Sequence, residues 1–104
     1  MKSILQNGRA RCYLCGLPPM VGDTLECHHV FGGALRKRSE EYGLKVYLHG
    51  KQCHRDGPFA VHRCAETRRA LQAEAQRLAM EAYGWTPEDW RKRFYKNYRG
   101  DEDV

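Results

Sequence analysis

The sequence predicts an α+β fold built from two short strands, a short helix and two longer helices. Two segments, "LECHHV" at residues 25–30 and "LKVYL" at 44–48, have the composition of strands, and the second half of the chain is rich in good helix formers. The chain has 104 residues, so we expect a single domain spanning 1–104. A domain of this size buries only about 60–70% of its unfolded surface, so its core is thin.

The segments between and after the two predicted strands have the sequence patterns of a loop and of a short helix. In "LKVYL" the aliphatic residues alternate with lysine and tyrosine, which is typical of a half-buried strand. The segment "FGGALRKRSEEYG", residues 31–43, is expected to be a long loop with a helical turn near 36–41. After the second strand, "HGKQCHRDGP" predicts a turn and a short helix that ends at Gly57 and Pro58.

Two longer helices are expected in the C-terminal part. The first covers about 64–83 and ends at Gly84, a natural C-cap. The second covers about 86–98 and begins with "TPED", in which threonine is an N-cap and proline fits the first helical position. Trp85 and Trp90 occupy the two positions of a hydrophobic staple and are expected in the core. The acidic end, residues 100–104, is expected to be a frayed tail.

Charge and composition narrow the class of partner. The formal net charge is +5, and basic residues cluster in the 36–38 loop and in the last predicted helix, which favours a polyanion such as nucleic acid. We see no secretory leader and no apolar run of about 18 residues, so we expect no membrane partner. The chain is therefore expected to be cytoplasmic, where cysteine and histidine clusters more often bind metal than form disulfides.

Cysteines and histidines are too numerous for one zinc ion. There are five of each, and a structural zinc takes four ligands. Two closely spaced pairs suit such a site, and we assign it to Cys12, Cys15, His49 and Cys53. Cys27 and Cys64 are then expected to be buried as small hydrophobic residues. A set that includes Cys27 or Cys64 in place of His49 remains the alternative.

Four histidines lie outside the assigned zinc site: His28, His29, His54 and His62. The first two are adjacent on a predicted strand, where neighbouring side chains point to opposite faces. They are therefore expected to have different roles. A local bend of the strand would be needed to bring both toward one reacting group.

The order "ECHHVFGG", basic loop, "LKVYL", "CHRDG" resembles the HNH endonucleases, which are ββα-metal nucleases. With "YGWTPEDWRKRFYKNY" included, the chain is similar over residues 12–99 to the small HNH proteins encoded by bacteriophages and prophages. The resemblance implies a zinc-stapled ββα-metal finger, a β-hairpin plus short helix with its core at 12–64, followed by the two C-terminal helices. It also implies a location in the bacterial host cytoplasm.

The resemblance further implies a function and roles for the histidines. The chain would be a metal-dependent DNA endonuclease, with His29 as the general base and His28 and His54 as ligands of the catalytic ion. His62 would be another ligand or a phosphate contact. The cofactors would be a structural Zn²⁺ and a catalytic Mg²⁺, Mn²⁺, Ni²⁺ or Zn²⁺. The partners would be double-stranded DNA and phage replication, recombination or packaging proteins.

The chain departs from this family in one respect. Its asparagines, Asn7 and Asn97, do not lie between the two histidine segments, whereas in the family an asparagine there helps to orient the base. Ser39, Glu40, Tyr42 or a backbone carbonyl near Leu44 are the candidates to replace it. The expected nucleic-acid contacts are Arg36, Lys37 and Arg38. The alternative function is a non-catalytic zinc module that binds nucleic acid or a phage partner protein.

Overall fold

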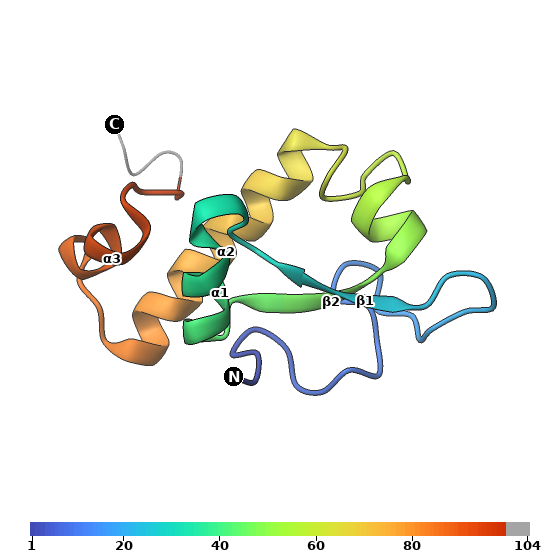
Figure 1. The fold of residues 1–104 in the computed structure, drawn as a ribbon, viewed down its shortest axis with the longest axis horizontal. Coiled ribbons are helices and arrows are strands. Elements are labelled where there is room, and N and C mark those ends of the chain that lie inside the picture. The colour runs from blue at the N-terminus through green and yellow to red at the C-terminus, as the bar shows by residue number, and fades with distance from the viewer. Residues whose placement is uncertain (100–104) are drawn as a thin grey trace.

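The computed structural model describes residues 1–99 and confirms the α+β class. Strands β1 (Leu25–His29) and β2 (Lys45–His49) form a two-stranded antiparallel sheet, in which Leu25 pairs with His49 and His29 pairs with Lys45. The hairpin runs across the middle of the molecule, with α1, α2 and α3 toward one end of it and the N-terminal segment passing along its other side (Figure 1). The tail predicted at 100–104 lies outside the described residues.

The segment between the strands is more helical than predicted. It holds a 3-10 turn, η1 (Gly33–Leu35), and a helix, α1 (Arg36–Tyr42). The helix ends at Gly43, whose φ of 71° is left-handed and whose added Cβ would lie 2.5 Å from the carbonyl oxygen of Lys2. The sequence of α1 is almost entirely charged, so it shows no apolar periodicity from which a helix could be predicted.

The short helix after β2 is a π-helix, η2 (Gly50–Arg55), rather than an ordinary α-helical segment. The chain then folds back on it. The backbone N–H of Val61 donates to the carbonyl of Cys53 at 2.9 Å, and that of His62 donates to the carbonyl of His54 at 3.0 Å. Two residues of η2 are therefore paired with the segment that leads into the next helix.

Both C-terminal helices are present, α2 (Ala65–Tyr83) and α3 (Pro87–Phe94). The predicted C-cap at Gly84 is confirmed, with a φ of 67°. The structure corrects the end of the last helix, which was predicted to extend to residue 98: it stops before Tyr95, whose φ of 74° is left-handed. Within residues 1–99, no helix is both long enough and apolar enough to cross a membrane.

The start of α3 has the predicted features. The hydroxyl of Thr86 accepts from the backbone N–H of Asp89 at 3.1 Å, and the Asp89 carboxylate accepts from the backbone N–H of Thr86 at 3.0 Å. This capping box satisfies N–H groups that the first turn leaves unpaired. The rings of Trp85 and Trp90 lie 6.4 Å apart on either side of it, which confirms the staple.

The apolar core gathers where β1 leaves the sheet. Phe31 follows β1 and packs against Trp90 and Phe94 of α3, with ring centroids 5.4 and 5.1 Å away, and all three side chains are fully buried. Helix α2 is tied to α1 through the hydroxyl of Tyr83, which donates to the carbonyl of Tyr42 at 2.7 Å. The helices thus fix one end of the hairpin.

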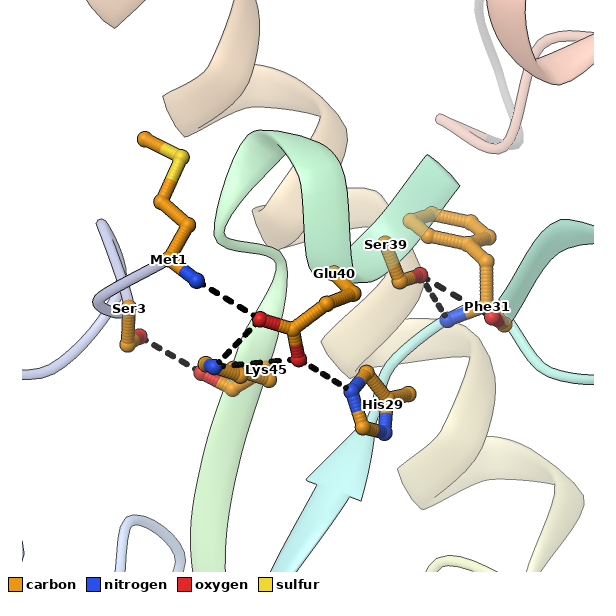
Figure 2. A network of polar contacts seen from close by, with 7 residues as sticks. All are labelled: Met1, Ser3, His29, Phe31, Ser39, Glu40 and Lys45. Carbon is orange, nitrogen blue, oxygen red and sulfur yellow. Dashed lines mark hydrogen bonds and ion pairs between the residues drawn. The ribbon is translucent and has the colours of Figure 1, made fainter. Parts of the chain in front are cut away.

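A single buried hydroxyl joins α1 to the end of β1. Ser39 is fully buried, its Oγ accepts from the backbone N–H of Phe31 at 3.0 Å, and it donates to the carbonyl of Phe31 at 2.9 Å (Figure 2). Both backbone groups of Phe31 therefore depend on this side chain. Its position beside Glu40 also fixes where the carboxylate of that residue can reach.

We predict that Ser39→Ala lowers the free energy of unfolding by about 1–3 kcal/mol, because it leaves buried backbone groups of Phe31 without partners. The measurement is urea denaturation followed by circular dichroism. Lys37→Ala, an exposed change in the same helix, is the control and should shift stability by less than about 0.5 kcal/mol. Equal stability of the two variants would contradict this assignment.

Candidate metal centres and the adjoining cavity

Four side chains meet at the end of the hairpin opposite the aromatic core. Their candidate ligand atoms all lie within 4.8 Å of one another, and we call them the Cys3His group: Cys12, Cys15, His49 and Cys53. The cysteine pair comes from the turn before β1, where the N–H of Gly16 donates to the carbonyl of Cys12 at 2.9 Å. Three sulfurs and one imidazole form a donor set that suits Zn²⁺.

The orientation of His49 fits a role as a ligand. Its Nε2 lies 2.8 Å from the carbonyl oxygen of Pro18, which can only accept, so Nε2 carries the ring proton. The other nitrogen, Nδ1, then holds the lone pair and lies 3.2 Å from Sγ of Cys15. The imidazole is thus held with its basic nitrogen toward the sulfurs.

The buried thiols of the group differ in acidity. Burial opposes ionisation of Cys12, but the backbone N–H groups of Cys15, His49 and Leu14 outweigh it and lower the pKa of that thiol. Burial and the neighbouring Cys12 raise the pKa of Cys53. A bound cation would favour the thiolate at both residues.

A second cluster, which we call the histidine triad, consists of His28, His54 and His62, whose candidate ligand atoms also lie within 4.8 Å of one another. The ring centroids are 4.7 to 5.1 Å apart. The residues come from β1, from η2 and from the segment paired with η2. His28 is buried, His54 is half-buried and His62 is exposed, so the cluster is open on one side.

Glu26 determines how His54 is oriented. Its carboxylate accepts from the guanidinium of Arg55 and from Nδ1 of His54, the latter at 2.9 Å, and these two contacts lower the pKa of Glu26 to about 2. An ionised carboxylate only accepts, so Nδ1 carries the proton and Nε2 holds the lone pair. That Nε2 lies 3.1 Å from Nε2 of His62. The sequence analysis missed Glu26, although its place two residues before His28 puts both on one face of the strand.

His28 is the least solvated member of the triad. Only 6% of the residue is exposed, and its Nε2 is buried without a hydrogen-bond partner among residues 1–99. Burial, together with His54 and His62, lowers the pKa of His28 to about 3, so the ring is neutral at cellular pH. Three imidazoles converge here around the unsatisfied Nε2 of His28, and these residues fit a divalent cation.

His29 takes no part in the triad. Its Nε2 lies 2.8 Å from Oε1 of Glu40, on α1 (Figure 2). It nevertheless lines the same cavity of about 240 Å³, whose walls are Cys27, His28, His29, Gly32, Arg36, His54 and His62. The adjacent histidines of β1 thus have different neighbours and share one cavity. Glu40 was one of several candidate partners for His29, and the sequence had no way to choose between them.

The three basic residues expected to contact nucleic acid differ in their distance from the cavity, and Arg36 is the one that lines it. Arg36 lines the cavity beside His29, whereas Lys37 and Arg38 are not among its lining residues. Lys37 is exposed and Arg38 is half-buried in α1. Among the three, Arg36 is therefore the residue best placed to meet a phosphate that enters the cavity.

Both cysteines expected to be buried are more exposed than predicted. Cys27 is exposed and lines the cavity, and Cys64 is half-buried at the N-cap of α2. Cys27 precedes His28 in β1, so the two side chains point to opposite faces of the strand, and that of Cys27 points away from the face covered by η2. In the described part of the chain, neither thiol belongs to the Cys3His group.

Comparison of the chain with protein-family models, curated proteins and solved structures finds no significant match.

We predict that Cys53→Ala weakens zinc binding at the Cys3His group more than about tenfold. Even the loss of a residue that only hydrogen-bonds to a metal ligand lowers metal affinity about 10–100-fold. Competition with a chromogenic chelator measures this. Cys64→Ala is the matched control, because it removes a thiol outside the group, and it should bind zinc like the unchanged protein. Equal losses in the two variants would mean that Cys64 is a ligand and would overturn the assignment.

Proposed function

We propose that the chain is a divalent-metal-dependent DNA endonuclease of the HNH type, with a zinc-stapled ββα-metal finger formed by the hairpin and η2. The observation that supports this best is a cavity lined by His28, His54 and His62 of the histidine triad and by an additional histidine, His29. A metal site and a separate base beside it are the two elements that phosphodiester hydrolysis needs.

In this proposal the residues of the triad hold the catalytic ion, and Glu26 keeps the ligand nitrogen of His54 in place. When bound, such an ion acts as a Lewis acid toward the phosphate and the leaving 3′ oxygen. His29 removes a proton from the attacking water, because it lines the cavity but is not part of the triad. Arg36, which also lines the cavity, binds the phosphate.

The Cys3His group has a structural role in this account. It includes three sulfurs, and two of its members are buried cysteines, which is typical of a closed zinc site. Double-stranded DNA is the proposed partner, and the net charge of +5 supports binding to a polyanion. We further propose a phage or prophage origin and activity in the host cytoplasm, both of which rest on the family resemblance.

The experiment is nicking of supercoiled plasmid with Mg²⁺, Mn²⁺, Ni²⁺ or Zn²⁺ added to the zinc-loaded protein. We expect nicking with at least one of these ions and its loss on chelation. His29→Ala should lower the rate about 10²–10⁴-fold at saturating metal, as expected for loss of a general base. His54→Ala should instead raise the metal concentration needed for half-maximal rate.

Two results would contradict the endonuclease proposal: plasmid that stays supercoiled with every ion, or equal nicking by His29→Ala. Salt-sensitive DNA binding without cleavage would favour the alternative, a non-catalytic nucleic-acid-binding module. The absence of an asparagine between the histidine segments is the observation that favours that alternative. Zinc content and circular dichroism of each variant serve as controls for folding.

A further inference from the structure

Three charged or titratable side chains meet at His29, the histidine that lines the cavity but lies outside the triad. Oε1 of Glu40 lies 2.8 Å from Nε2 of His29, and Nζ of Lys45 lies 3.1 Å from Oε1 and 2.9 Å from Oε2 of the same carboxylate (Figure 2). His29 and Lys45 are opposite one another in the sheet. A single carboxylate from α1 thus spans a cross-strand pair.

The geometry holds the Glu40 carboxylate in one place. Ser39, the preceding residue, fixes α1 to the backbone of Phe31 by two hydrogen bonds. Lys45 donates to both carboxylate oxygens, and the amino group of Met1 lies 2.7 Å from Oε2. The Met1 amino group, His29 and Lys45 all lower the pKa of Glu40, so it accepts hydrogen bonds as a carboxylate.

An ionised carboxylate at this distance selects one form of the neutral imidazole. Because it can only accept, the hydrogen of His29 is on Nε2, and Nδ1 is left with the lone pair. The side chain of His29 is 11% exposed, so few other partners can compete for Nε2. A carboxylate that accepts a hydrogen bond from one ring nitrogen of a histidine both orients the ring and stabilises the imidazolium form.

We propose that Glu40 is the positioning residue for His29, holding Nε2–H so that Nδ1 is presented to water. This inference rests on the function proposed above and specifies how the base is oriented without the family's asparagine. In the step concerned, a proton of water passes to Nδ1 of His29 and the water oxygen bonds to phosphorus. The bond from phosphorus to the 3′ oxygen breaks, and that oxygen takes a proton from solvent.

The first test needs neither DNA nor catalytic metal. Long-range ¹H–¹⁵N NMR spectra report which ring nitrogen of a neutral histidine carries the proton. In the zinc-loaded protein we expect His29 as the Nε2–H form. Glu40→Ala should give a mixture of the two forms, and Glu41→Ala, an exposed change in the same helix, should leave the spectrum of His29 unchanged.

The second test is single-turnover plasmid nicking at saturating protein and metal. Glu40→Ala should lower the rate about 10–100-fold, with DNA affinity unchanged in fluorescence anisotropy, whereas Glu41→Ala should keep the full rate. Glu40→Gln keeps an accepting oxygen and should retain more activity than Glu40→Ala. Glu40→Leu, whose side chain is of similar size and cannot accept a hydrogen bond, replaces Glu40→Ala in both tests should the alanine variant not fold.

The outcomes separate this inference from the proposed function. An unchanged Nε2–H form in Glu40→Ala, or in Glu40→Leu where the alanine variant does not fold, overturns the role of Glu40 while leaving the endonuclease intact. Equal rate losses in Glu40→Ala and Glu41→Ala also overturn it. A protein that never cleaves DNA but shows the expected NMR change refutes the endonuclease and retains the Glu40–His29 pair.

Discussion

The backbone pairing between η2 and the segment after it is the constraint on which both metal groups depend. The carbonyls of Cys53 and His54 accept from the N–H groups of Val61 and His62. Cys53 and His54 are consecutive in the chain, yet one belongs to the Cys3His group and the other to the histidine triad. A shift of η2 by one residue would move Cys53 away from the Cys3His group and His54 away from the histidine triad.

The hairpin connects a polar, ligand-rich end to an apolar end. Leu25 pairs with His49 beside the Cys3His group, and the other end of β1 leads directly to Phe31 in the aromatic core. A small domain is stable by only about 5–15 kcal/mol, and binding of a structural zinc contributes an apparent 10–16 kcal/mol or so at neutral pH. A zinc ion in the Cys3His group would therefore stabilise the end of the hairpin that the aromatic core does not reach.

The sequence predicted local features better than distant ones. Cys12 and Cys15 are close in the chain, and the capping residues of α3 belong to one short motif, so the cysteine pair and the start of α3 could be predicted. Helix α1 was not expected in full, because its stability depends on Ser39 and on packing rather than on an apolar stripe. The contacts of Glu26 with His54 and of Glu40 with His29 join residues 28 and 11 positions apart, and only the folded hairpin brings them together.

The proposed function requires two separate metal groups in this chain rather than one shared site. Native mass spectrometry of the zinc-loaded protein measures ions per chain directly, with Cys12→Ala and His62→Ala variants alongside. We predict two ions in the unchanged protein and one in each variant, and X-ray absorption should show the ion that remains in His62→Ala bound to thiolates. A single ion that both variants abolish would contradict it, because that result requires one site built from both sets of residues.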